Sequence, residues 1–268
     1  MMSRMRPFVL AAGLLLAGFA QAQPETFPAA RARGELVVGV PYLAPPPVAG
    51  AKIRTPEGLD AAITDKLGAS LNLPVRLVQL PAADAARALK AGEVDLVLAD
   101  RVDGQPQTVA VQATGYAARP KAVIRTDTRM RKPADVQGRS VCMAEAATQA
   151  QALAQSWGAT VKTYRVPSDA LVAVREGACD IGLVDDAVWE PLMRFPEWKK
   201  FSSTLTPDGA RHERVWLLPA QDETSRAWLG QEMRAWDRAG AWKAMTTKWA
   251  RDVAFDVYLD QEVPDCHG

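Results

Sequence analysis

The chain contains few residues of the types that bind metals. Among its 268 residues are three cysteines and two histidines. No C-x-x-C or H-x-x-H spacing occurs, and His212 and His267 are far apart, so the sequence offers no candidate metal site. It also lacks a glycine-rich phosphate loop, a dinucleotide fingerprint and a serine nucleophile elbow. We therefore expect neither a metal nor another cofactor.

Neither positive nor negative charge is in excess. The 32 Lys and Arg residues nearly balance the 31 Asp and Glu residues, which leaves a formal net charge of +1. There is no polybasic segment of the kind that binds anionic lipid. Nucleic acid is not an expected partner, because binding to phosphate backbones needs a surplus of basic residues.

Long apolar runs are missing except near the N-terminus. Arg4 and Arg6 precede the apolar residues 8–20, and Ala20-Gln21-Ala22 has the A-x-A form of a cleavage site. The apolar run has about 13 residues, fewer than the ~20 that a membrane-spanning helix needs. No cysteine follows it that could carry a lipid anchor. We interpret residues 1–22 as a signal peptide and expect a soluble product in a bacterial periplasm.

A repeated pattern is the most informative feature present. Residues 82–100 (AADAARALKAGEVDLVLAD) align without a gap with residues 167–185 (PSDALVAVREGACDIGLVD). Each copy has helical periodicity, a glycine where the helix should end, and an apolar strand that ends in an aspartate. Chance similarity between two ordinary helix-strand units is the alternative interpretation.

The segments that precede the two copies support duplication over chance. Strands are predicted at 35–40 and 74–80 with a helix at 59–71, and again at 140–143 and 160–166 with a helix at 148–157. The fold class is therefore α/β, with two similar lobes and a central cleft. Ligands of parallel α/β sheets bind outside the carboxyl ends of the strands, where Asp100 and Asp185 lie, one in each lobe.

The cysteines allow one disulfide in an oxidising compartment. Cys142 lies in the predicted strand SVCMA, and Cys179 begins the strand CDIGLV. These strands should be neighbours in the second lobe, which favours a Cys142–Cys179 bridge and leaves Cys266 free. The alternative pairing is Cys179 with Cys266.

The last part of the chain should return to the first lobe. Residues 213–218 (ERVWLL) read as a returning strand, followed by two helices. Apolar stripes mark the helices, and we interpret both as packing onto the first lobe; the stripes are Leu229, Met233 and Trp236, then Trp242, Met245 and Trp249.

Several segments together resemble a known family. They are GELVVGVPYLAPP, EGLDAAITDKL, AGEVDLVLAD, ADVQGRSVCMAEAATQ, EGACDIGLVDD, DRAGAWKAMTTKWA and FDVYLD. In order and spacing they are similar to the periplasmic binding proteins of polar amino-acid ABC importers, solute-binding protein family 3. The resemblance implies a monomeric type II binding protein that captures a small solute and delivers it to a membrane ABC permease. It also implies two hinge strands, near residues 114–118 and 207–215. The first lobe would comprise 23–116 and 216–268, and the second 117–215.

The resemblance also implies ligand-binding positions. Tyr42 is the nearest aromatic residue in the first loop, Thr148 lies in the small-Thr-Gln turn, and Asp185 stands where the family binds an ammonium group. Asp186 replaces Asp185 if the register slips. The T-x-x-R arginine that binds a carboxylate is missing. Arg101 is the only basic residue in that loop, and it either takes the place of that arginine as a ligand-binding residue, beside Asp100, or pairs with Asp100 or Asp103.

Two acidic cleft residues without a firm anion site favour a cationic ligand, such as a basic amino acid or an amine. We expect a binding protein and not an enzyme. One alternative is a dehydratase of the cyclohexadienyl type on the same fold, with Glu145 as the candidate general acid. Another is a sensor or accessory domain that binds a partner.

Overall fold

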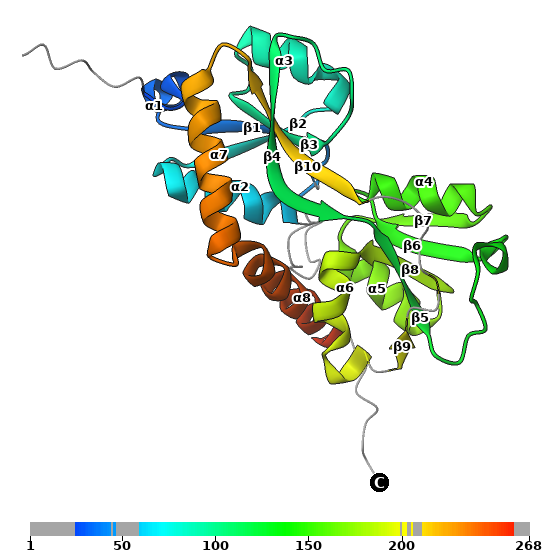
Figure 1. Cartoon of the computed structure of the whole chain (residues 1–268). Helices are drawn as coiled ribbons and strands as arrows, with labels where there is room; N and C mark the ends of the chain where they lie inside the picture. The colour runs from blue at the N-terminus through cyan, green and yellow to red at the C-terminus, as the bar shows by residue number, and fades with distance from the viewer. Residues whose placement is uncertain are drawn as a thin grey trace, which may run out of the picture.

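The structure, a computed structural model, describes residues 25–43, 45–46, 59–198, 200–202, 205 and 211–259. The predicted signal peptide, 1–22, and Cys266 lie outside these residues. The described chain forms two lobes, each built on a five-stranded sheet with helices on its faces (Figure 1). No described helix is both long and apolar enough to cross a membrane.

The first lobe holds the sheet of order β2-β1-β3-β10-β4. Strands β1, β2 and β3 are parallel, and β10 runs antiparallel to both β3 and β4. The strands are β1 (Leu36–Val40), β2 (Val75–Gln79), β3 (Leu96–Asp100), β4 (Val109–Ala118) and β10 (His212–Pro219). The helices are α1 (Pro28–Arg33), α2 (Leu59–Leu71), α3 (Ala85–Ala91) and α7 (Glu223–Arg238), with a 3-10 turn at Ala82–Asp84.

The second lobe holds the sheet of order β7-β6-β8-β5-β9. Its strands are β5 (Pro120–Arg125), β6 (Ser140–Ala144), β7 (Thr160–Tyr164), β8 (Ile181–Asp185) and β9 (Phe201–Ser202). Its helices are α4 (Thr148–Ser156), α5 (Pro167–Glu176) and α6 (Asp186–Met193), with 3-10 turns at Pro133–Val136 and Pro196–Trp198.

The two sheets repeat one arrangement, which confirms the predicted fold class. In each, a central strand (β1 or β6) has parallel neighbours on both sides, and an antiparallel strand (β10 or β5) follows. The duplicated sequence forms α3 and β3 in one lobe and α5 and β8 in the other. Parallel strands that run the same way place Asp100 and Asp185 at equivalent strand ends.

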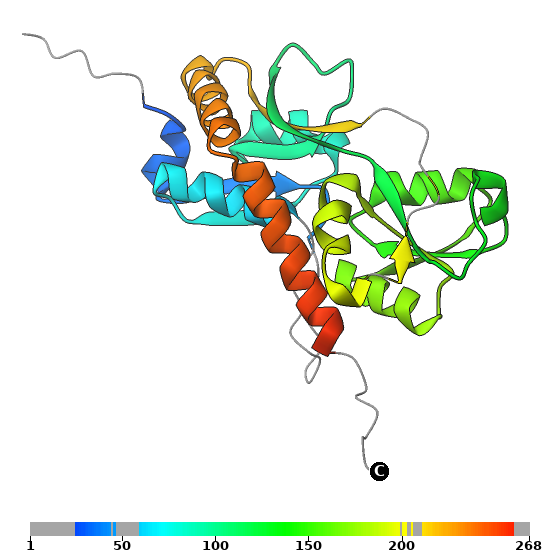
Figure 2. The ribbon, with the colours of Figure 1, turned by 60° about the horizontal axis from the view of Figure 1, so that its bottom comes forward.

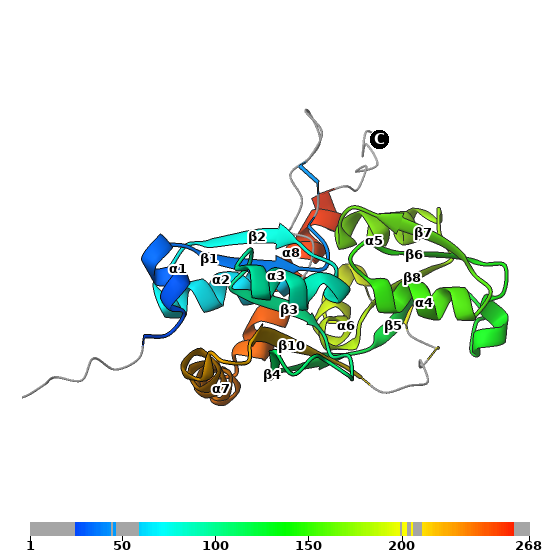
Figure 3. The same cartoon turned by 90° about the horizontal axis from the view of Figure 1, so that it is seen from above.

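The chain passes from the first sheet to the second between β4 and β5 (Figure 3). Strand β4 of the first sheet ends at Ala118, and β5 of the second begins at Pro120. The return runs from β9 to β10. The chain therefore leaves the first sheet at Arg119 and returns to it between Ser202 and His212. The lobe boundaries of 23–116, 117–215 and 216–268 stay a prediction.

A β-bulge lies in the first crossing strand. The register of β4 against β10 shifts so that residues 114–116 lie opposite Arg214. Gly115 has φ 87°, in the left-handed region of the backbone. A residue with a Cβ atom would adopt this conformation only at a cost in free energy. The Thr114 hydroxyl donates a 2.6 Å hydrogen bond to the Arg214 carbonyl and accepts one of 3.0 Å from the Tyr116 amide. The bulge thus positions Tyr116 and Arg214 together.

The last helix, α8 (Ala241–Leu259), connects the two lobes (Figure 2). Trp242 and Met245 pack against the core of the first lobe. Trp249 instead belongs to the core of the second lobe, together with Ala250 and Val253. The prediction that both terminal helices pack onto the first lobe alone is therefore wrong for Trp249, because α8 is long enough to reach α5 and α6.

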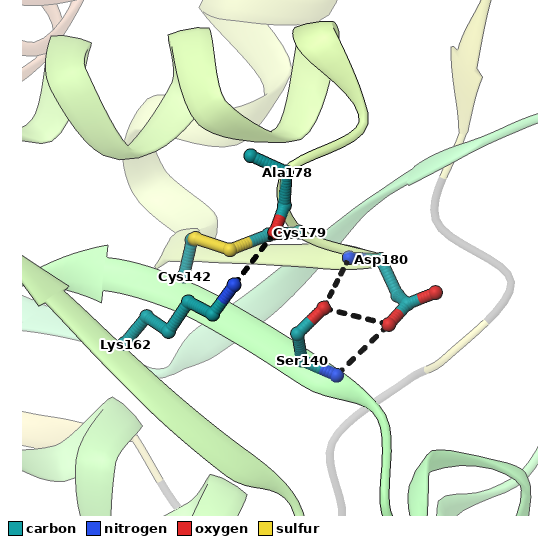
Figure 4. The surroundings of a disulfide bond; sticks show 6 residues. All are labelled: Ser140, Cys142, Lys162, Ala178, Cys179 and Asp180. Atoms are coloured by element: carbon teal, nitrogen blue, oxygen red, sulfur yellow. Dashed lines mark hydrogen bonds between the residues drawn. A yellow bond between two sulfur atoms is a disulfide. The ribbon is translucent and has the colours of Figure 1, made fainter.

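A disulfide joins Cys142 of β6 to Cys179, two residues before β8 (Figure 4). The two Cα atoms are 6.0 Å apart. Next to it, Ser140 donates from its amide and its hydroxyl to the Asp180 carboxylate, at 2.9 and 2.7 Å. The pairing confirms the favoured bridge, although Cys179 precedes β8 and Cys142 lies opposite Gly182 where the two strands pair.

Candidate functional site

A cavity of about 540 Å³ is lined by residues of both lobes. Its lining includes the carboxyl ends of strands from each sheet, as expected for α/β proteins. From the first lobe come Val40, Tyr42, Leu59, Asp60, Asp100 and Arg214, and from the second Ala144, Thr148, Gln149, Leu171, Asp185 and Val188.

Much of the cavity wall is apolar, with charge confined to a few places. A mostly apolar concave wall with a few polar groups is typical of small-molecule sites. The larger apolar lining residues are Leu43, Leu59, Leu77, Leu171, Leu183, Val188 and Trp249. Trp249 comes from α8, so the connecting helix contributes to the wall as well as to the core of the second lobe.

Arg214 lies between two carboxylates of the first lobe. Its guanidinium donates to Asp100 at 2.9 Å and to Asp60 in the first turn of α2. Only 14% of its side chain is exposed. Burial alone would lower the pKa of Arg214, but the charges of Asp60 and Asp100 hold it above its ordinary value. Arg214 is therefore a permanent cation whose charge is already compensated within the protein.

Sequence reasoning missed Arg214 as a cleft residue. It follows Glu213 at the start of the returning strand ERVWLL, where charged residues at a strand end are ordinary. The contacts that define it come from Asp60 and Asp100, both more than a hundred residues away in sequence. The one sequence signal for a role of Arg214 is that a charged residue stands at the start of an otherwise apolar strand.

Asp185 is the carboxylate of the second lobe in this cavity. Asp185 is exposed toward the cavity, and desolvation by the enclosing walls raises its pKa to about 6. Arg214 and a 3.3 Å hydrogen bond from the Tyr116 hydroxyl act in the opposite direction. Burial and the Asp185 charge also raise the pKa of Tyr116, which keeps it a hydrogen-bond donor. At neutral pH Asp185 is an anion that would attract a cation.

Hydrogen bonds connect the two lobes around the cavity. Each joins a residue of the first lobe to a residue near the strand ends or first helix of the second. In addition to the bond from Tyr116 to Asp185, they include Tyr42 to Glu145 at 2.7 Å, Gln149 to Asp100 at 3.2 Å, and Arg165 to the Pro45 carbonyl at 3.2 Å. The lobes are therefore held together by side chains from both.

Four of the five predicted ligand-binding residues line the cavity. They are Tyr42, Asp100, Thr148 and Asp185. Arg101 is the exception: its guanidinium donates to Glu213 at 2.6 Å, and it is not among the lining residues. The ligand-binding roles of all five residues stay predictions.

Asp186, the alternative to Asp185, begins α6 and takes part in the crossing between the lobes. Its carboxylate accepts two hydrogen bonds from Arg211, at 3.0 and 2.8 Å, and lies 3.5 Å from the Arg119 guanidinium. Asp186 is not among the residues that line the cavity.

Solved structures share this fold at low sequence identity. An arginine-bound mutant of ArgBP from T. maritima has a TM-score of 0.54 at 16% identity, covering 78% of this chain and 99% of that one. YckB from Bacillus subtilis has a TM-score of 0.59 at 16% identity, with coverage of 86% and 96%. The substrate-binding protein AbpA of an amino acid ABC transporter from Streptococcus pneumoniae, bound to L-arginine, has a TM-score of 0.58 at 12% identity, covering 85% and 98%.

A family model provides the stronger evidence of relationship. No curated protein sequence matches the chain significantly. Residues 36–252, however, match the model of the bacterial extracellular solute-binding proteins, family 3. This range includes the duplicated segments, both strand-end aspartates, Arg214 and the start of α8. The chain therefore belongs to family 3 of the bacterial extracellular solute-binding proteins.

Proposed function

We propose that this chain is an exported binding protein that captures a small cationic solute, a basic amino acid or an amine, for a membrane ABC importer. The observation that carries the proposal is the charge of the cavity. Its described lining contains Asp60, Asp100 and Asp185 but a single guanidinium, that of Arg214. Arg214 is bonded to Asp60 and Asp100, so Asp185 is the carboxylate available to a ligand cation.

The similar structures support this choice of ligand class. AbpA was solved with L-arginine, and the ArgBP mutant is arginine-bound. Arginine, the ligand in both structures, carries the cationic groups that an acidic cavity would attract. We further propose that the lobes, 23–116 with 216–268 and 117–215, close on the solute by rotating about Arg119 and the second crossing, as a monomer in the periplasm.

We propose a binding role in preference to an enzymatic one. Glu145, the candidate general acid, accepts a 2.7 Å hydrogen bond from the Tyr42 hydroxyl and is not among the residues that line the cavity. General acid catalysis needs the acid within reach of the bound leaving group. Incubation with prephenate tests this choice, because conversion of prephenate would make the dehydratase the correct function.

A thermal-shift screen tests the binding proposal. Basic, neutral and acidic amino acids, diamines and monoamines would each be added to the protein at neutral pH. A cationic solute at a hundred times its Kd should add about 2.7 kcal/mol to the free energy of unfolding. Asp185→Asn should remove the shift, because it removes the compensating anion. Binding of acidic amino acids alone would refute the proposal.

A further inference from the structure

Two features of the cavity could attract a ligand anion, and Asp100 reaches both. One is the Arg214 guanidinium, 2.9 Å from one Asp100 oxygen. The other is the side-chain amide of Gln149 in the first turn of α4, where the helix N-terminus adds a partial positive charge. This amide donates to the second Asp100 oxygen at 3.2 Å. A carboxylate of the protein therefore already lies between these two features.

Arg214 is also bound on its other side. Asp60 accepts from a different guanidinium nitrogen than Asp100 does, and only 14% of the Arg214 side chain is exposed. A ligand carboxylate that approached Arg214 would have to displace one of these carboxylates or lie beside it. Like charges placed side by side in an enclosed site are strongly unfavourable.

Other residues of the cavity lining suit a ligand with one cationic end. The Asp185 carboxylate, held by the Tyr116 hydroxyl, faces the cavity and can accept from an ammonium group. The same cavity is also lined by apolar side chains such as Leu171, Val188 and Trp249. These surfaces fit an ammonium group attached to a hydrocarbon body.

We propose that Asp100 occupies the place of a ligand carboxylate, so that the cavity selects amines without a carboxylate over the corresponding α-amino acids. The inference rests on the proposed function, which it narrows from cationic solutes in general to amines. Asp100 is then a specificity-determining residue, because it excludes the amino acid without contacting the ammonium group.

Matched pairs of compounds test the inference directly. Agmatine and arginine, cadaverine and lysine, and phenethylamine and phenylalanine differ within each pair by one carboxylate. Titration calorimetry with the intact mature protein should show the amine binding at least about tenfold more tightly in the pair that binds best. An amino acid that binds as tightly as its amine, or more tightly, would overturn the inference and leave the proposed function standing.

A variant tests the role of Asp100 itself. Asp100→Asn removes the charge but keeps the shape, so it should free Arg214 on one side and shift the preference toward the amino acid by about tenfold or more. Glu213→Gln is the matched control, since it removes a carboxylate that is paired with Arg101 and does not line the cavity. An unchanged preference in Asp100→Asn refutes the role.

The outcomes also separate the two proposals. If no amine and no amino acid binds the wild-type protein, the proposed function fails and the inference fails with it. If Asp100→Asn does not fold, as judged by circular dichroism, the matched pairs measured with the wild type still decide the preference for amines.

Discussion

The protonation of Asp185 makes solute binding depend on pH. Its pKa is raised to about 6, so it is ionised at neutral pH and largely protonated one unit below 6. A cation loses its partner when the carboxylate is protonated. Affinity for a cationic solute should therefore fall about tenfold between about pH 7.5 and pH 5. Titration calorimetry measures it, and a flat profile would exclude Asp185 as the ammonium partner.

The conformation of Gly115 can be tested with a pair of variants. Its φ of 87° belongs to the left-handed region, so Gly115→Ala should reduce the free energy of unfolding by about 1–2 kcal/mol. Gly115→Asn should cost less, because asparagine tolerates this region better. Urea denaturation measures both. Equal costs for the two variants would mean that contact of the new Cβ with the Trp242 indole nitrogen, at 3.5 Å, decides the effect instead.

At the level of elements, α8 should stabilise the second lobe through one side chain. Trp249 is 8% exposed and packs in the core of that lobe, so Trp249→Ala should cost about 3–5 kcal/mol. Phe255, on the same helix, is 59% exposed, and Phe255→Ala should change stability by less than about 0.5 kcal/mol. Chemical denaturation compares them. Similar losses in both variants would contradict the packing described for α8.

The disulfide stabilises the second lobe by restricting the unfolded chain between β6 and β8. Cys142 and Cys179 are 37 residues apart, and closing a loop of this length is worth about 3–4 kcal/mol in the chain-entropy model. Replacing both by alanine should lower the free energy of unfolding by that amount. Denaturation with and without reductant gives an independent value for the wild type. No response to reductant would argue against a formed bridge.

For the whole molecule, contacts between the lobes should influence solute affinity. The Tyr42 hydroxyl bonds to Glu145 of the other lobe at 2.7 Å. Tyr42→Phe should weaken solute binding by about 0.5–1.5 kcal/mol, the usual net value of one hydrogen bond. Tyr258→Phe makes the same chemical change at a residue that is 56% exposed on α8, and should have no effect. Unchanged affinity in Tyr42→Phe would show that this bond plays no part, and equal loss in both variants would show that the effect is not specific to it.

The sequence alone predicted the duplicated units and where their strands end. Glycine-terminated helices, apolar strands and strand-end aspartates are patterns of neighbouring residues, so a single chain displays them directly. This is why the two lobes, the cavity position of Asp100 and Asp185, and the Cys142–Cys179 bridge could be predicted.

Only the tertiary structure decided how the charges are compensated and where the last helix packs. Arg214 between Asp60 and Asp100, Gln149 against Asp100, and Trp249 in the second lobe each depend on contacts between distant segments. Local periodicity does not report which of several arginines a carboxylate meets. That choice is made when distant segments pair: β10 lies antiparallel to β3 with Arg214 opposite Asp100.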